Sequence, residues 1–261
     1  MAATPSSATP TSSPLFYQSP VLLNFKEHGQ FGLRPEVTFG FAAEATAIPL
    51  VATEFAQAQR HYPIVFASNE GAMPLAVTGL TVGRNLFVDP QGNWTAGTYV
   101  PGYVRRYPFI SMAPEAGGAT MLGLDATSSR VSADAARDGA DRLFTADGKP
   151  TQVGSAAMAF CDAYAVEYER TRAFAAALVA HGLLAERSAR IKHPNGTEQV
   201  VQGFRLIDEP TFRALPADVV AEFHAKGWLD LIVLHFASQG SWLTLMERAT
   251  AGDGAPASAL N

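Results

Sequence analysis

The sequence predicts an α+β protein, with antiparallel strands in its N-terminal half and helices concentrated in its C-terminal half. Short segments rich in β-branched and aromatic residues recur between residues 62 and 124, and turns built on Gly, Pro, Asn and Asp separate them. The longest stretch with helical periodicity, residues 155–181, comes afterwards. Strands and helices therefore do not alternate, which favours α+β over a doubly wound parallel sheet.

The clearest strand signal is the apolar segment Tyr62–Phe66. Asn69–Gly71 supplies a turn, and residues 73–80 return from it. Because so short a turn cannot make a parallel crossover, the pattern predicts an antiparallel meander. Further strands of this meander are expected at residues 85–88, 107–110 and 121–124.

Upstream of this hairpin the signals are shorter. Phe39 and Phe41 flank Gly40 in a strand-like alternation. Pro49 is expected in the first turn of a helix that runs to Gln59, because proline fits that position.

The long helix predicted over residues 155–181 ends at Gly182, a residue favoured just past a helix C-terminus. Asn195-Gly196 then predicts a tight turn between two strands, residues 188–193 and 198–207.

The C-terminal region continues with a helix over residues 216–226. Residues 229–236 are apolar and fit either a strand or a buried helix. Ser238 is expected to cap a final helix that runs to Arg248.

Both ends of the chain have the composition of disordered tails. Residues 1–13 are almost only Ala, Thr, Ser and Pro, and residues 251–261 are similar, so neither offers enough apolar surface to offset the entropy of ordering. Residues 14–250 are predicted to form a single α+β domain. A helical subdomain over residues 151–250 is the alternative arrangement.

Charge and composition limit the classes of partner. The net charge is −5 and no basic stripe is present, so we expect no nucleic-acid partner. Charged residues make up 16% of the chain, against about 25% in typical soluble domains. This favours a surface covered by a partner or by another copy in a homo-oligomer, although a monomer fits as well.

The sequence predicts a cytoplasmic location. The N-terminus lacks the charged and apolar regions of a secretory signal, and no window approaches the roughly 18 apolar residues of a transmembrane segment. The one cysteine, Cys161, lies in an apolar helical run and is expected to be a buried, unreactive thiol. Export by a specialised system without a cleaved signal is the alternative.

No catalytic or cofactor motif is visible, so we predict no metal and no cofactor and assign no catalytic residue. Phosphate loops, dinucleotide fingerprints, nucleophile elbows and paired-cysteine or His-Glu-x-x-His metal motifs are all missing. His235 lies in an apolar run and is expected in the core, whereas His28 lies in a predicted loop next to Glu27. An enzyme with a dispersed metal- or acid/base-dependent site that uses His28 or His235 is the second functional hypothesis.

The most unusual stretch, residues 94–109, combines aromatic rings with two adjacent arginines. Arginine binds carboxylates or phosphates with two parallel hydrogen bonds and stacks on rings, so this stretch is the predicted binding surface. The alternative is that the aromatic side chains seal the sheet while the arginines pair with acids inside the fold. The predicted binding residues are Trp94, Tyr99, Tyr103, Arg105, Arg106 and Tyr107.

Several segments together resemble the SapC family of bacterial proteins, over residues 14 to about 248. They are Leu15-Phe16-Tyr17 with Pro20-Val21, Tyr62–Phe66, Leu86–Asp89 with Gly92 and Trp94, Arg105–Phe109, and the region from Gly203-Phe204 to Leu245. The resemblance implies a link to surface-layer proteins and their secretion. Family members also resemble products encoded near outer-membrane receptors and flavin-dependent halogenase-like enzymes. It implies no set of catalytic residues.

The leading functional hypothesis is therefore a non-enzymatic binding or accessory protein with a protein or peptide partner. It would serve cell-envelope (surface-layer) assembly, secretion or a peptide-modifying system.

Overall fold

The computed structural model describes residues 14–112, 120–192 and 198–253, and it confirms the α+β class. In all three described sheets neighbouring strands run antiparallel. Residues 1–13 and 254–261 lie outside the described residues, so the predicted tails stay predictions, as does the Asn195-Gly196 turn. No helix in the described part of the chain is both long enough and apolar enough to cross a membrane.

The chain divides into two compact units, each built from two stretches of sequence. The first unit comprises Met1–Pro35 and Tyr107–Ser155, and the second comprises Glu36–Arg106 and Ala156–Asn261. The single domain predicted over residues 14–250 stays a prediction.

The first unit holds two small sheets. One has the order β1-β7-β6 and the other β8-β2-β9. The strands are β1 (Pro20–Leu22), β7 (Met121–Asp125), β6 (Phe109–Met112), β8 (Val131–Ser132), β2 (Gly32–Leu33) and β9 (Asp141–Arg142). Two short helices, α1 (Phe25–His28) and α4 (Ala135–Asp138), complete this unit.

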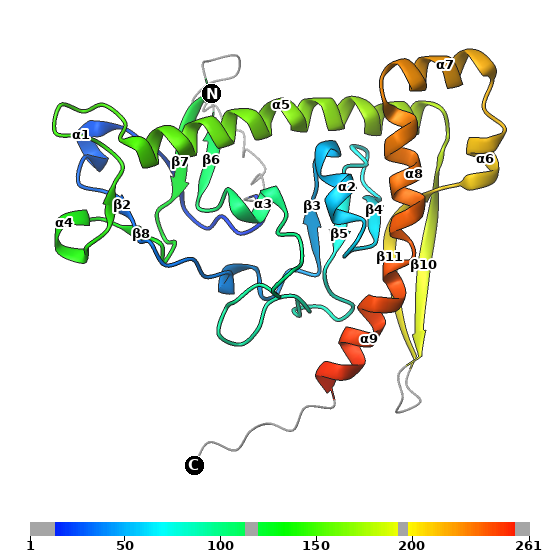
Figure 1. Ribbon diagram of the computed structural model, residues 1–261, viewed down its shortest axis with the longest axis horizontal. Coiled ribbons are helices and arrows are strands. Elements are labelled where there is room, and N and C mark those ends of the chain that lie inside the picture. Colours follow the sequence, from blue (N-terminus) through cyan, green and yellow to red (C-terminus); the bar gives the residue numbers. More distant parts are fainter. Residues whose placement is uncertain (1–13, 113–119, 193–197, 254–261) are drawn as a thin grey trace, which may run out of the picture. The chain divides into compact units, whose positions relative to one another are not determined.

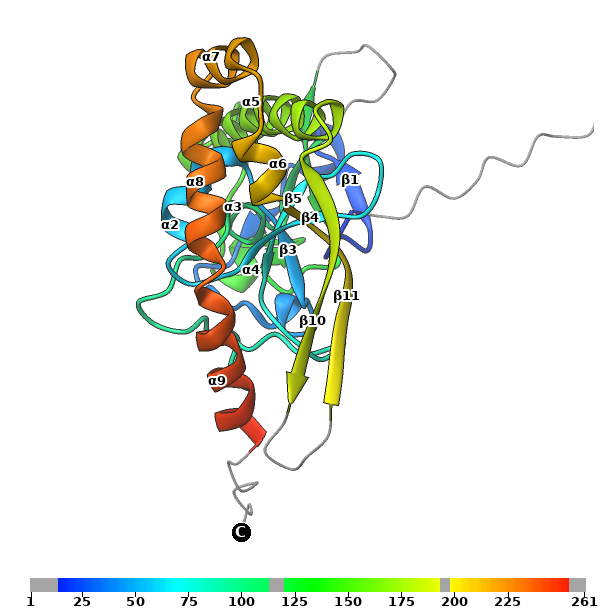
Figure 2. The same ribbon diagram turned by 90° about the vertical axis from the view of Figure 1, so that its right-hand side faces the viewer.

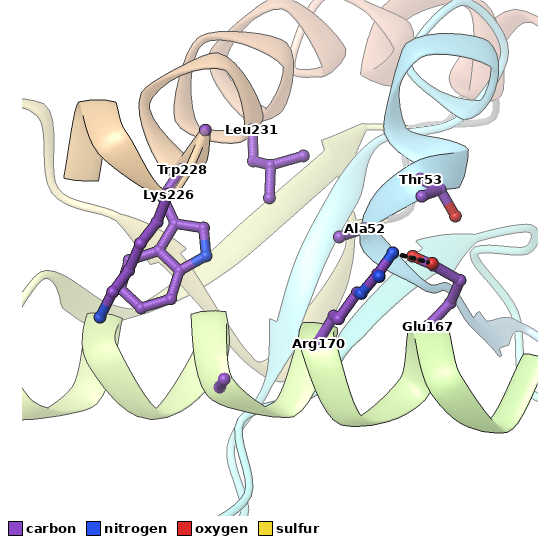
Figure 3. Close-up of a pocket in the computed structure, with 9 residues that line it drawn as sticks. Ala52, Thr53, Glu167, Arg170, Lys226, Trp228 and Leu231 are labelled. Carbon is purple, nitrogen blue, oxygen red and sulfur yellow. Dashed lines mark hydrogen bonds and ion pairs between the residues drawn. The ribbon is translucent and has the colours of Figure 1, made fainter. Parts of the chain in front are cut away.

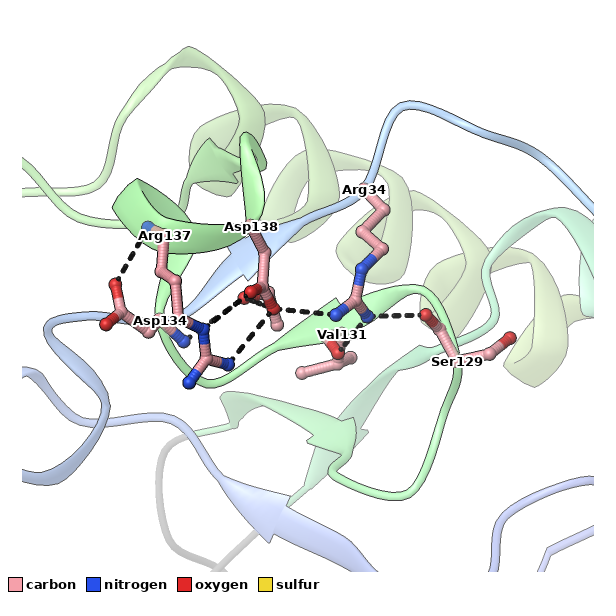
Figure 4. Close-up of polar contacts among 7 residues, drawn as sticks. Arg34, Ser129, Val131, Asp134, Arg137 and Asp138 are labelled. Atoms are coloured by element: carbon pink, nitrogen blue, oxygen red, sulfur yellow. Dashed lines mark hydrogen bonds and ion pairs between the residues drawn. The ribbon is translucent and has the colours of Figure 1, made fainter.

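An arginine on the chain after β2 organises the loop between β7 and α4. The Arg34 guanidinium donates to the carbonyls of Ser129 and Val131 at 2.7 and 2.8 Å and to Asp138 Oδ2 at 2.7 Å (Figure 4). Hydrogen bonds from Arg137 and then from Ser132 hold the pKa of Asp138 down at about 2. This cluster is satisfied internally and fixes α4 in place.

The second unit is built on a five-stranded sheet with the order β10-β11-β4-β5-β3. Its strands are β10 (Leu184–Lys192), β11 (Glu198–Ile207), β4 (Ile64–Ala67), β5 (Pro74–Val77) and β3 (Ala47–Pro49). The predicted β4–β5 hairpin is confirmed, with Ile64 opposite Ala76 and Phe66 opposite Pro74. The predicted pairing of the strands on either side of Asn195-Gly196 is confirmed as the antiparallel pair β10 and β11.

Seven helices of the described residues lie wholly or partly in this unit. They are α2 (Phe55–Ala58), α3 (Gly102–Arg105), α5 (Gln152–Ala180), α6 (Glu209–Arg213), α7 (Ala217–Ala225), α8 (Trp228–Ser238) and α9 (Ser241–Asp253). The long helix α5 belongs to the second unit from Ala156 onward. Helix α8, orange-red in Figures 1 and 2, packs on α2, β4 and β11.

Aromatic side chains from several elements meet in the core of the second unit. Phe174 of α5 is fully buried, and its ring lies 6.3 Å from both Phe55 and Phe66. Trp228 of α8 lies 6.1 Å from the same ring. The core thus joins α5, α2, β4 and α8, which also build the candidate site.

Two short-range predictions in this unit are wrong. Gly40–Ala42 forms a 3₁₀ turn rather than a strand, because Phe39 pairs with the Gly92 carbonyl and packs on Trp94. Pro49 ends β3 instead of opening a helix, which begins only with the 3₁₀ turn Ala52–Glu54. Proline is tolerated there because β3 is an edge strand.

Two further differences have non-local causes. The strand expected at residues 85–88 is reduced to a single bridge between Val88 and Trp94, since Asn85 bonds to the chain at Ala42 and Ala43 instead. Ser238 lies inside α8 and does not cap the final helix. Its Oγ accepts from the Ile64 N–H at 3.0 Å, which ties α8 to β4. The ambiguous segment 229–236 is therefore a helix.

Candidate functional site

The predicted binding residues divide between the two units. Trp94, Tyr99, Tyr103, Arg105 and Arg106 belong to the second unit. Tyr107 belongs to the first, where it is 6% exposed and its hydroxyl donates to Asp125 at 3.2 Å.

Two buried aromatic side chains hold the segment that carries Tyr99. Trp94 is 8% exposed and its indole N–H donates to the Tyr62 hydroxyl at 3.2 Å. The Tyr62 hydroxyl in turn donates to the carbonyl of Tyr99. Burial raises the pKa of Tyr62 to about 12, so this phenol stays protonated and remains a donor. Trp94 therefore does not face the site but holds Tyr62, which in turn holds the backbone at Tyr99.

A buried carboxylate, Glu54, lies at the centre of the site. It is only 5% exposed, and its Oε2 accepts from the Val51 N–H at 2.8 Å. Its Oε1 accepts from the Gly102 N–H at 2.6 Å and from the Tyr99 hydroxyl at 2.8 Å. A Cβ at Gly102 would lie 3.2 Å from this oxygen, so the glycine permits the close approach. Glu54 thus fixes α3 and Tyr99 against the 3₁₀ turn.

Tyr99 connects this carboxylate to Arg105. Burial, together with the neighbouring Glu54 carboxylate, raises the pKa of Tyr99 to about 12. The neutral hydroxyl donates to Glu54 and accepts from Arg105 Nη2 at 3.1 Å.

Arg105 is an exposed arginine with a fixed orientation. Its Nε donates to the Val100 carbonyl at 3.0 Å. Its guanidinium lies 5.3 Å from the Phe160 ring centre and 5.6 Å from that of Tyr99. Within the described residues it forms no ion pair with a carboxylate, and its Nη1 forms no hydrogen bond. Arg105 therefore presents a held guanidinium that has no direct carboxylate partner among the described residues, with the Tyr99 hydroxyl between it and Glu54.

Arg106 has a different environment from its neighbour. It is half-buried, and its guanidinium lies 4.2 Å from the Tyr103 ring and 4.6 Å from the Tyr164 ring. Tyr103 is itself 7% exposed. Nearby, burial raises the pKa of the Cys161 thiol to about 11, in agreement with the predicted unreactive cysteine.

A hollow of about 190 Å³ opens beside Arg105, and we name it the Arg105 hollow. The short helix α3 and the 3₁₀ turn form its walls, and α5 forms its floor. Its lining residues are Val51, Thr53, Glu54, Tyr99, Gly102, Arg105, Phe160, Ala163, Tyr164 and Glu167.

A second hollow of about 430 Å³ lies further along α5, and we name it the Trp228 hollow. In Figure 3, Arg170 and Glu167 rise from α5, Trp228 and Leu231 of α8 lie on one side, and Ala52 and Thr53 lie on the other. Thr53 and Glu167 line both hollows.

A buried threonine sets the distance between α5 and the turn at Ala52. Thr171 is fully buried, and its Oγ accepts from the Ala52 N–H at 2.8 Å while donating to the Glu167 carbonyl at 2.6 Å. The 3₁₀ turn that contributes Thr53 to both hollows is therefore hydrogen-bonded to α5.

The two histidines of the enzyme hypothesis have structural surroundings. His235 is fully buried against Phe66, and its Nε2 accepts from the Ile207 N–H at 3.2 Å. His28 is 9% exposed and its Nδ1 accepts from the Asn24 N–H at 3.2 Å. Neither lines the Arg105 or the Trp228 hollow. In the described residues no group of three or more His, Cys, Asp and Glu side chains is placed to hold a metal.

Sequence reasoning did not select Glu54, Phe160 or Trp228 as site residues. Glu54 was visible only as part of a helical pattern, and Phe160 and Trp228 only as apolar residues of helices. Nothing in the local sequence distinguishes a residue that lines a hollow from a residue that packs in the core.

Comparison with known proteins gives one match. The family model SapC matches residues 23–245, a range that contains both hollows. The chain belongs to the SapC family. No curated protein and no solved structure matches this SapC chain.

Proposed function

We propose that this SapC-family protein is a non-enzymatic accessory protein that binds a peptide or protein segment through a carboxylate at Arg105. Its binding role would serve cell-envelope (surface-layer) assembly, secretion or a peptide-modifying system. One observation carries the proposal: Arg105 is exposed, held in one orientation and without an acidic partner among the described residues.

The geometry around Arg105 suits carboxylate capture. A guanidinium matches a carboxylate with parallel N–H donors, and charge-assisted hydrogen bonds of this kind are stronger than neutral ones. Because Val100 and Tyr99 already fix the side chain, binding loses little further side-chain entropy. The local positive charge also stands out in a chain whose net charge is −5.

The enzyme hypothesis has less support from the site. Burial lowers the pKa of His235 to about 4, with the Ile64 backbone opposing the shift. The imidazole is therefore neutral at pH 7 and lies in an apolar setting. The His28 imidazole accepts a hydrogen bond from the Asn24 N–H, at the start of the short helix that contains it.

The direct test measures binding of a defined peptide, N-acetyl-Gly-Asp-Gly-Ser-amide, by isothermal titration calorimetry, which also applies to variants that lack Arg105. Its Asp-to-Asn counterpart serves as the matched ligand without charge. We expect saturable binding of the Asp peptide only, and a loss of at least about tenfold in Arg105→Ala. Arg105→Lys should recover part of the affinity because it keeps the charge but not the planar fork.

The matched control is Arg172→Ala. Arg172 is another exposed arginine of the second unit, pairs with Glu169 at 2.7 Å and lines neither hollow. It should bind the Asp peptide like the unaltered protein. Equal binding of the Asp and Asn peptides, or unchanged binding by Arg105→Ala, would refute the proposal.

A further inference from the structure

We infer that the Arg105 hollow and the Trp228 hollow bind one ligand together. The ligand is an extended peptide segment of about six residues, with an acidic side chain at one end and an apolar side chain at the other. This inference rests on the proposed carboxylate capture at Arg105 and specifies what else the partner must contain.

The two hollows are neighbours along one helix. Thr53 and Glu167 border both, so a ligand that occupies both hollows passes over these two side chains. Between Phe160, which lines the first hollow, and Ala173, which lines the second, α5 rises by about 20 Å. An extended chain covers that length in about six residues.

The Trp228 hollow suits an apolar side chain. Trp228 and Leu231 are both half-buried and face the hollow from α8, while Ala52 and Ala173 add small apolar surfaces. At about 430 Å³ it falls within the range of ligand-binding clefts. The Lys226 ammonium lies 4.4 Å from the Trp228 ring centre and pairs with Glu222 at 2.6 Å, so this cation is compensated.

The charges along the two hollows set the position of the ligand's acidic end. Arg170, which lines the Trp228 hollow, pairs with Glu167 at 2.7 Å with 70% of its side chain exposed. Arg105 alone among these cations has no carboxylate partner in the described residues, which places the ligand's carboxylate at that end.

The test uses two hexapeptides that differ in direction, N-acetyl-Asp-Gly-Ser-Gly-Ser-Leu-amide and N-acetyl-Leu-Ser-Gly-Ser-Gly-Asp-amide. Each has a Leu-to-Ser and an Asp-to-Asn counterpart. Binding is followed by NMR through the indole N–H of Trp228, assigned with Trp228→Phe, and by calorimetry. We expect one direction to bind at least about tenfold more tightly than its Leu-to-Ser counterpart, the gain typical of burying such a side chain.

Ala173→Glu fills the floor of the Trp228 hollow with a charged side chain that helices tolerate. It should abolish the Leu-dependent gain and leave the Asp-dependent binding intact. Ala176→Glu is the matched control, because Ala176 is exposed on the same helix and lines neither hollow.

The outcomes separate the two proposals. Asp-dependent binding without any gain from Leu overturns the shared-ligand inference and leaves carboxylate capture standing. Binding without dependence on Asp, or no binding of any peptide, overturns both. If Ala173→Glu instead changes the oligomeric state measured by light scattering, a second copy of the chain occupies the hollow and the inference is wrong.

Discussion

Arg105 and Arg106 are neighbours in the sequence, yet their side chains have opposite environments. Arg105 is exposed and held by hydrogen bonds, whereas Arg106 is half-buried between the Tyr103 and Tyr164 rings. Cation–π contacts with partly desolvated rings contribute about 0.5–2 kcal/mol each. Arg106 therefore contributes to stability, and Arg105 is the one available to a ligand.

We predict that Arg106→Ala lowers the free energy of unfolding by about 1–3 kcal/mol, through lost ring contacts and lost packing of its aliphatic stem. Arg105→Ala should lower it by less than about 1 kcal/mol. Urea denaturation of both variants checks this, and equal losses would contradict the assignment.

Glu54 is the residue on which the Arg105 hollow depends. Three hydrogen bonds converge on the two oxygens of its buried carboxylate, and at least one donor would lose its acceptor if either oxygen were replaced. Hydrogen bonds to charged groups contribute about 1.5–3 kcal/mol, and a donor left unpaired costs a similar amount.

We predict that Glu54→Gln lowers the free energy of unfolding by about 3 kcal/mol, because its amide nitrogen must face a donor. The control is Glu44→Gln at an exposed position of the same unit. Urea denaturation measures both, and a loss no larger than that of the control would show that Glu54 is replaceable.

His235 makes stability depend on pH. Burial holds its folded pKa at about 4, below the ordinary value of 6.5. Between these two values the unfolded chain binds the proton and the folded chain does not, so stability falls as the pH falls.

We predict that this histidine alone removes about 3 kcal/mol of stability between pH 7 and pH 4. His235→Gln, whose side-chain oxygen can accept from the Ile207 N–H, should flatten the fall by that amount. The comparison is urea denaturation from pH 7 to pH 4. His224→Gln, at an exposed site, should keep the original slope.

At the scale of elements, α5 shows how a local signal ends a helix. Gly182 has a φ of 63°, and its N–H bonds to the Val179 carbonyl while the Leu183 N–H bonds to the Leu178 carbonyl. This pair of bonds is the Schellman arrangement, which requires a left-handed residue. The end of α5 also determines where the next strand, β10, begins.

We predict that Gly182→Ala costs about 1 kcal/mol in the free energy of unfolding, and Gly182→Asn clearly less. A Cβ at this glycine would meet no atom within 4 Å, so the cost is backbone strain alone. Urea denaturation compares the two variants. A smaller loss for Ala than for Asn would rule out this explanation.

The elements that the sequence predicted correctly are those whose hydrophobic pattern extends over many residues. The 29-residue α5 and the paired hairpin strands repeat their pattern often enough to exclude alternatives. The three residues around Gly40 and the four residues Asn85–Val88 are too short to repeat a pattern. Hydrogen bonds to distant loops determined the conformation of both segments.

At the scale of the whole molecule, the chain passes between its two compact units more than once. Residues 107–155 of the first unit interrupt the second, and α5 contains residues of both. We expect a helix shared in this way to couple the unfolding of the two units, as in the predicted single domain.

We predict one cooperative unfolding transition. Trp94, Trp228 and Trp242, the three tryptophans of the chain, all belong to the second unit, so their fluorescence follows that unit alone. Far-UV circular dichroism follows both units. Coincident urea curves would support a single domain, and two separated midpoints would show independent units. Light scattering on the same samples tests the homo-oligomer favoured by the low charge.

The sequence alone determined the fold class, the β4–β5 hairpin and the long helix, because those signals lie within a few residues of one another. It also sufficed for the resemblance to the SapC family, which the family match confirmed. Only the tertiary structure separated Arg105 from Arg106 and placed Tyr107 in the other unit. It alone brought Glu54, Arg105 and Trp228 to the same stretch of α5. These contacts join residues some fifty or more positions apart, and no local periodicity encodes which distant side chains meet.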